Sequence, residues 1–95
     1  MHRKDALNYV AGLLAHEAQK HYTDFQNAVA ASRSTDRTIA EVNAVESAHI
    51  AARVVKTLWV AKALKIEQQF RNECGRLGVN LEQCLGYPPR WDSVD

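Results

Sequence analysis

Residues 54–66, VVKTLWVAKALKI, decide the fold of this chain. They contain neither glycine nor proline, so nothing in them stops a helix. On that helix, however, the apolar side chains point in nearly every direction, and a helix that is apolar all round is a buried one. The fold therefore depends on what covers the sides that a single packing partner cannot reach.

The chain around this stretch predicts a long antiparallel helical hairpin. Residues 4–32 contain one glycine and no proline, and their apolar residues recur at spacings of three and four, which is typical of an amphipathic helix. Residues 34–37 are predicted to form the turn, with Thr35 or Asp36 as the N-cap of the next helix. The second helix is predicted over residues 37–74, which contain neither glycine nor proline.

A break in the second helix near residues 46–49 is the alternative, because Ser47 belongs to a residue type that caps a new helix. An apolar stripe that continues through this region favours the unbroken helix. Its members are Val45, Ala48, Ala52, Val55, Trp59, Ala63, Ile66 and Phe70. We expect this stripe to pack against the first helix.

The last quarter of the chain predicts a short helix and a tail. Gly75 and Gly78 are the expected end of the second helix, since glycine accepts the left-handed conformation that closes a helix. Asn80 is then the N-cap of a short helix over residues 81–85. Two prolines follow, so residues 87–95 are predicted to be an extended tail. The fold class is therefore all-α, with the whole chain in one domain.

A second apolar face of the long helix indicates a second chain. It contains Ile50, Val54, Leu58, Ala61 and Leu64. Each large residue left exposed would forgo burial free energy on the order of 1.5–3 kcal/mol, against a net domain stability of roughly 5–15 kcal/mol. We therefore expect a homodimer in which two hairpins form a four-helix bundle with these residues at the interface. The alternative is that a broken second helix turns this face inward, which makes a monomeric three- or four-helix bundle.

The composition favours no particular class of partner. The net charge of the 95 residues is +1, although residues 50–78 hold six basic and only two acidic side chains. No stretch approaches the roughly 20 apolar residues of a membrane span, and the N-terminus does not resemble a signal peptide. Two cysteines are too few for a disulfide framework or a finger-type zinc site. We therefore expect a cytoplasmic protein with both cysteines reduced.

Two pairs of glutamate and histidine are the candidates for a metal site. Glu46 and His49 form a Glu-x-x-His step like that of helical di-iron bundles, but those proteins need two such steps and two further glutamates. Glu17 and His21 form a second pair at i and i+4. A metal-binding helical bundle is therefore one alternative function, whereas surface pairing is the simpler interpretation. The prediction is that no metal or other cofactor is bound.

A basic, dimeric nucleic-acid-binding protein is another alternative. The basic side chains that could contact phosphates are Arg53, Lys56, Lys62, Lys65, Arg71 and Arg76. Their positions on a helical wheel scatter over both sides of the helix instead of forming one stripe. Long charged side chains beside apolar stripes usually extend along the edge of a helical bundle, so nucleic-acid binding is the less favoured interpretation.

No pattern in the chain predicts catalysis. Cys74 lies near a helix C-terminus, where the helix dipole disfavours a thiolate, and Cys84 lies in a short apolar helix. Ser47 near His49 lacks the strained turn that exposes a nucleophilic serine. We therefore predict that the protein is not an enzyme.

The sequence instead favours an interaction module, such as a small accessory or inhibitory factor of the kind that phages and mobile elements carry. We expect its partner to be another protein or protein complex. The predicted partner-binding residues are Glu46, His49, Arg53 and Lys56 on the long helix, with Tyr87, Arg90 and Trp91 in the tail. In the alternative interpretation of the tail, its aromatic residues cover the chain's own hairpin.

Overall fold

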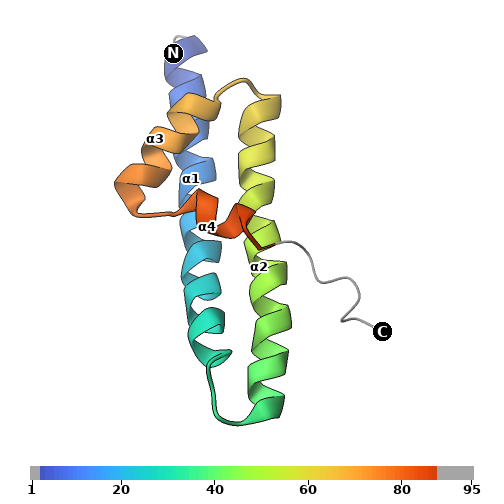
Figure 1. Cartoon of the computed structure of the whole chain (residues 1–95). Helices are drawn as coiled ribbons and strands as arrows, with labels where there is room; N and C mark the ends of the chain where they lie inside the picture. Colours follow the sequence, from blue (N-terminus) through green and yellow to red (C-terminus); the bar gives the residue numbers. More distant parts are fainter. Residues whose placement is uncertain (1–2, 88–95) are drawn as a thin grey trace.

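The computed structural model describes residues 3–87, and in this range it contains four helices and no strand. The helices are α1 (Arg3–Ala31), α2 (Arg37–Ala63), α3 (Glu67–Leu77) and α4 (Leu81–Leu85). α1 and α2 lie side by side as a long antiparallel hairpin (Figure 1). The predictions of an all-α fold, of the hairpin and of the short helix are therefore confirmed.

Side-chain caps fix where two of the helices begin. The Asp36 carboxylate accepts a hydrogen bond of 3.1 Å from the backbone N–H of Ile39, so Asp36 and not Thr35 is the N-cap of α2. The Asn80 side chain accepts a bond of 3.1 Å from the N–H of Gln83. Each cap satisfies a backbone donor that the first turn of a helix leaves without a partner.

The prediction of one unbroken helix over residues 37–74 is wrong, and the break lies at residues 64–66 rather than at 46–49. Lys65 takes a left-handed conformation with φ of 61°. The N–H of Ile66 donates to the carbonyl of Ala61 at 2.9 Å, and the N–H of Lys65 donates to that of Lys62 at 3.0 Å. These two bonds are the Schellman termination of a helix, which normally has glycine at the left-handed position.

The burial of Ile66 explains why the chain accepts this strain. Ile66 and Ala61, the two residues joined by the longer-range bond, are both fully buried. The same arrangement ends α3, where Gly78 has a φ of 77° and the N–H of Val79 donates to the carbonyl of Cys74 at 2.9 Å. Gly78 therefore ends a helix as predicted, whereas Gly75 lies inside α3.

We expect Lys65→Gly to raise the free energy of unfolding by about 0.5–1 kcal/mol. A left-handed L-residue costs roughly 1–2 kcal/mol, and the greater freedom of glycine in the unfolded chain offsets part of this gain. Chemical denaturation followed by circular dichroism measures the change. The matched control is Lys20→Gly within α1, which we expect to lower the stability by about 1 kcal/mol. A destabilised Lys65→Gly variant would contradict the strain at residue 65.

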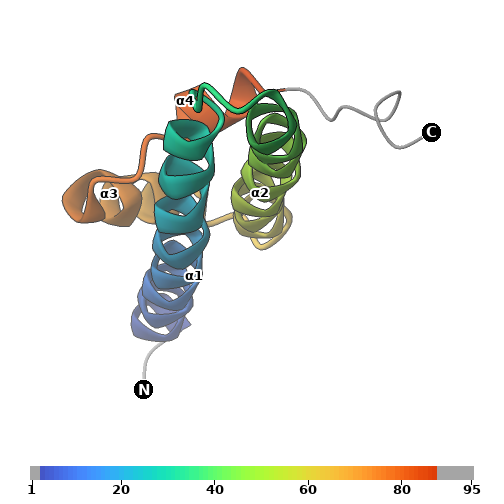
Figure 2. The same ribbon diagram turned by 90° about the horizontal axis from the view of Figure 1, so that it is seen from below.

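The break lets α3 and α4 close the core within one chain. α3 packs mainly against α1, and α4 packs against α2; both views place α3 on the side of α1 away from α2 (Figures 1 and 2). Phe70 and Cys74 of α3 and Leu81 and Cys84 of α4 are buried in the same apolar cluster as the inner faces of the hairpin. A single hairpin is thus converted into a four-helix unit.

The predicted dimer interface is corrected by this packing. Ile50, Val54, Leu58 and Ala61 are at most 5% exposed within the single chain, so these four residues need no second chain to cover them. Leu64, the fifth, remains 46% exposed at the end of α2. The apolar face of α2 that was assigned to a dimer is thus the face that packs inside the single chain.

Alanines make up much of the buried surface of the two long helices. Ala11, Ala15 and Ala18 of α1 are fully buried, as are Ala51 and Ala61 of α2. Small side chains allow two helix backbones to approach closely, which leaves little free volume between them. Larger residues fill the core beside these alanines, and the largest of those that are fully buried are Phe25, Phe70, Leu58 and Ile66.

Polar contacts tie α4 to the hairpin and α3 to α4. The Tyr22 hydroxyl donates a hydrogen bond of 2.8 Å to the side-chain oxygen of Gln83. The Arg71 guanidinium contacts the carboxylates of Glu67 at 2.7 Å and Glu82 at 2.9 Å. Its hydrogen bond is the main reason why the pKa of the Glu67 carboxyl lies below its ordinary value.

Across residues 3–87, none of the helices has the combination of length and apolar content that a membrane crossing requires.

Candidate functional site

α1 and α2 form a groove to which neither α3 nor α4 contributes a residue, and we call it the hairpin groove. Its volume is about 300 Å³. It is lined by Leu14, Glu17 and His21 of α1 and by Arg53, Lys56, Thr57 and Val60 of α2. Leu14, Thr57 and Val60 supply its apolar surface, whereas charged or titratable side chains lie at its edges.

The two sides of the hairpin groove differ in charge. On the α1 side, Nε2 of His21 lies 3.0 Å from a carboxylate oxygen of Glu17. On the α2 side, Arg53 and Lys56 are exposed and form no ion pair with any residue in the range 3–87. The groove therefore offers two unpaired cations beside an apolar floor, which suits a ligand that carries carboxylates and an apolar face.

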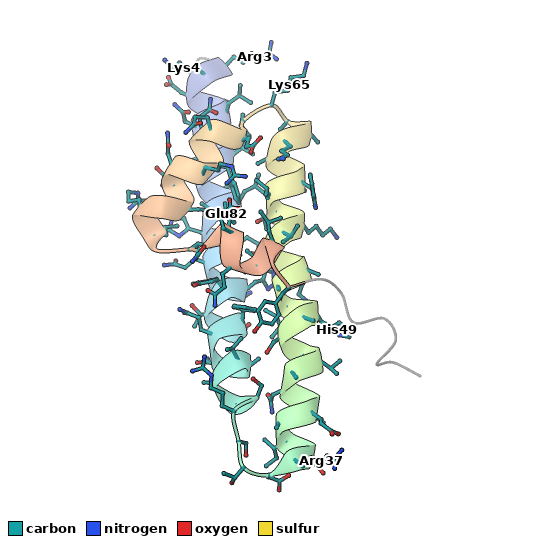
Figure 3. All side chains as sticks on the ribbon, in the orientation of Figure 1. Arg3, Lys4, Arg37, His49, Lys65 and Glu82 are labelled. Carbon is teal, nitrogen blue, oxygen red and sulfur yellow. The ribbon has the colours of Figure 1, made fainter. Side chains whose placement is uncertain are left out.

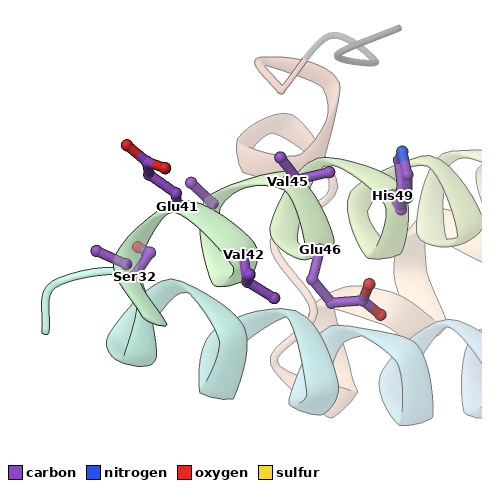
Figure 4. A pocket seen from close by; sticks show the side chains of 8 residues that line it. Ser32, Glu41, Val42, Val45, Glu46 and His49 are labelled. Atoms are coloured by element: carbon purple, nitrogen blue, oxygen red, sulfur yellow. The ribbon is translucent and has the colours of Figure 1, made fainter. Parts of the chain in front are cut away.

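The predicted polar strip on α2 is divided between two places. Arg53 and Lys56 border the hairpin groove, whereas Glu46 and His49 line a shallow hollow of about 790 Å³ near the hairpin turn. Figure 4 shows that Val45 and His49 point away from α1 while Glu46 points toward it. Because its side chains come almost entirely from one helix and diverge, this hollow does not converge on a small ligand.

Sequence reasoning missed that the hairpin brings Glu17 and His21 of α1 opposite Arg53 and Lys56 of α2. It identified the Glu17–His21 pair as a local contact but not its neighbours across the groove. The only available signal was the hairpin register, which aligns residues on two antiparallel helices once the turn is known. It also missed Leu14, Thr57 and Val60, whose apolar character gives no functional signal in the sequence.

The groups considered for metal or nucleophile chemistry do not assemble into a site in the described structure. Among residues 3–87, no three side chains of histidine, cysteine, aspartate or glutamate are grouped closely enough to hold a metal ion. Cys74 and Cys84 are free and buried, and burial raises the pKa of each thiol to about 11. Both thiols are therefore protonated near neutral pH and lack the thiolate that nucleophilic catalysis requires.

Half of the basic residues considered for phosphate contact are held in ion pairs. Lys62 and Arg71 contact Glu67, and Arg76 contacts Glu73 at 2.6 Å. Lys65, Arg3 and Lys4 lie at one end of the molecule, and Arg37 lies at the other end (Figure 3). The basic side chains of the described region therefore do not form one continuous surface for a nucleic-acid backbone.

The predicted docking tail lies mostly outside the described residues, which include Tyr87 but neither Arg90 nor Trp91. The Tyr87 ring packs edge-on against Phe25, with ring centroids 5.1 Å apart. This contact agrees with the alternative in which the aromatic residue covers the chain's own hairpin. For the chain as a whole, no known family model, characterised protein or solved structure matches it.

Proposed function

We propose that this protein is a cytoplasmic, non-enzymatic interaction module, of the accessory or inhibitory type, that binds an acidic segment of another protein in the hairpin groove. The observation that carries the proposal is the pair Arg53 and Lys56, exposed and without ion-pair partners in the described chain beside an apolar groove. Elsewhere on α2 and α3, most long basic side chains have a carboxylate within reach.

The chemistry of the groove defines the partner. Its carboxylates would pair with Arg53 and Lys56, and its apolar side chains would cover Leu14 and Val60. Val60 is 38% exposed in the absence of a partner. An amphipathic helix or an extended segment with acidic residues on one edge meets both requirements, as in other cases where a helix lies in a groove between helices. The Glu17 carboxylate, paired with His21 on the opposite edge, would repel the carboxylates of the partner. The acidic edge of the segment would therefore face Arg53 and Lys56, which sets its orientation in the groove.

The test begins with a photo-cross-linking residue placed at Val60, and with the same residue at Tyr9 as the control. Tyr9 is 63% exposed on α1 and does not line the groove. We expect the Val60 position alone to capture a partner, which mass spectrometry identifies and which is then purified for binding measurements.

With the purified partner, we expect Arg53→Glu combined with Lys56→Glu to weaken binding on the order of 100-fold. Truncating or reversing a desolvated charge pair typically costs 2–5 kcal/mol, and 1.4 kcal/mol is tenfold in affinity. Lys20→Glu, which changes an exposed α1 lysine outside the groove, should alter the affinity less than threefold. Equal losses for both variants, or capture only of nucleic acid with a steep dependence on salt, would overturn the proposal.

A further inference from the structure

The sides of the hairpin groove continue along both helices at seven-residue intervals. On α2, Glu46, Arg53 and Val60 follow one another at steps of seven residues, and all three are exposed. On α1, Asp24 follows Glu17 by seven residues, and both are exposed. Because seven residues are close to two helical turns, Glu46 and Asp24 lie on the same sides of their helices as the groove residues. The groove is therefore the centre of a longer open face of the hairpin.

One end of this open face is apolar. Val60 is 38% exposed, and Leu64, one turn later on α2, is 46% exposed. Leu14 lines the groove with Val60, and Val10, one turn earlier on α1, is half-buried. Because α1 and α2 are antiparallel (Figure 1), the turn before Leu14 and the turn after Val60 lie at the same level. Apolar side chains of both helices thus meet at this end.

The other end of the open face is acidic. Asp24 and Glu46 form no ion pair with any residue of the described chain, 3–87. Glu46 points toward α1, whereas Glu41, on another side of α2, points away from it (Figure 4). The cations Arg53 and Lys56 lie between the two ends. The open face therefore has an apolar, a basic and an acidic level, separated by roughly 10 Å, the rise of seven helical residues.

We infer that the partner segment is an α-helix that carries an apolar, an acidic and a basic side chain at successive seven-residue steps. The inference rests on the proposed function and specifies its partner. The apolar residue would cover Val60 and Leu64, the carboxylate would pair with Arg53 and Lys56, and the basic residue would face the acidic level. A shift by one step in either direction would bring like charges together, so the pattern also fixes the register.

The spacing of the levels favours a helix over an extended segment. Side chains seven residues apart in a helix return to one face and rise by roughly 10 Å, which matches the levels of the open face. In an extended segment, roughly 10 Å corresponds to about three residues, and side chains three residues apart point to opposite faces. An extended partner could therefore not meet successive levels with one of its faces.

The first test compares cross-links at the two ends of the open face, with the partner that the Val60 position captures. The cross-linking residue is placed at Val42, one turn before Glu46, or at Leu64; these side chains are 62% and 46% exposed. The two positions are 22 residues apart, which is roughly 33 Å along a helix. We expect the partner residues that they cross-link, identified by mass spectrometry, to be about 22 positions apart.

Two outcomes of this experiment would overturn the inference. An extended segment would cover the same distance in about 10 residues, so partner residues about 10 positions apart would exclude a helix. Cross-linking at Leu64 but not at Val42, or the reverse, would show that the partner does not run along the whole open face.

The second test is Glu46→Lys, which we expect to weaken binding of the same purified partner about tenfold, because it places a cation against the basic residue of the partner. The matched control is Glu41→Lys, the same change of charge on the side of α2 that points away from α1; it should alter the affinity less than threefold. Reversing the charge of the matching partner residue should restore most of the affinity that Glu46→Lys loses. Circular dichroism confirms that each variant is folded.

Failure of the helix pattern can be distinguished from failure of the groove. If the combined Arg53→Glu and Lys56→Glu variant loses binding while Glu46→Lys and Glu41→Lys have equal affinities, the groove binds the partner but the three-level pattern is wrong. If Val60 captures no partner, or if the combined variant binds as the wild type does, the proposed function and this inference are both overturned.

Discussion

Phe70→Ala is expected to lower the free energy of unfolding by about 3–5 kcal/mol, the largest loss among the substitutions considered. Phe70 is completely buried on α3 and belongs to the core cluster that joins α3 to α1. A domain of this size is only moderately stable, with roughly 5–15 kcal/mol at most. Removing the ring therefore removes a large part of the free energy of unfolding. We expect α3 to detach from α1 before the hairpin itself unfolds.

Urea denaturation followed by circular dichroism measures this loss. Leu13→Ala is the control, because Leu13 is 53% exposed on α1 and should change the stability by less than 0.5 kcal/mol. Hydrogen exchange in the Phe70→Ala variant should show faster exchange in α3 than in α1 and α2. A loss below 1 kcal/mol would mean that α3 is not docked as the structure describes.

Ala18→Leu is expected to destabilise the protein strongly, because it enlarges a fully buried alanine of α1. Ala18 has no exposed surface and lies in the row of buried alanines Ala11, Ala15 and Ala18 of α1. Added methyl groups in a close-packed core typically cost 1–3 kcal/mol, because neighbouring side chains or backbone must shift to make room. A shift of roughly 4–8 °C in melting temperature accompanies each kcal/mol in a domain of this size.

Ala30→Leu on the exposed side of α1 makes the same chemical change outside the core. Its melting temperature should stay within about 2 °C of the wild type, since exposed substitutions usually change stability by less than 0.5 kcal/mol. Equal melting temperatures for the two variants would contradict close packing around Ala18.

Several helix ends could be predicted because residue types that act locally mark them. Asp36 caps α2, Gly78 ends α3 and Asn80 begins α4, as the sequence indicated. The break at Lys65 could not be predicted in this way, because a lysine occupies a position that normally requires glycine. Tertiary burial of Ile66 imposes the conformation, and local propensity gives no sign of it.

The orientation of α2 was predicted wrongly for a related reason. Two opposite faces of α2 are apolar, so periodicity alone does not determine which one is buried. Size decides between them in the structure. The side with the small residues Ala51, Val54 and Ala61 is buried in the close-packed core, whereas the larger Trp59 lies outside.

Only the α2 side of the hairpin groove could be predicted from the sequence. Arg53 and Lys56 were identified from their place on the polar side of the long helix, and the structure places both at the edge of the hairpin groove. Glu17 and His21 are 32 to 39 residues away in sequence, and only the register of the hairpin brings them opposite these cations. A single sequence does not define that register, since it depends on the turn and on packing between the helices.

The placement of α3 and α4 against α1 has a consequence for biosynthesis. α1 leaves the ribosome before α3 and α4, yet its contacts with Leu77 and Gln83 join residues 58 and 61 positions apart. Nascent α1 must therefore wait, with part of its apolar face uncovered, until α3 and α4 have been translated. Long-range closure of this kind slows folding relative to a plain hairpin, which makes the half-synthesised chain the form most exposed to chaperones and proteases.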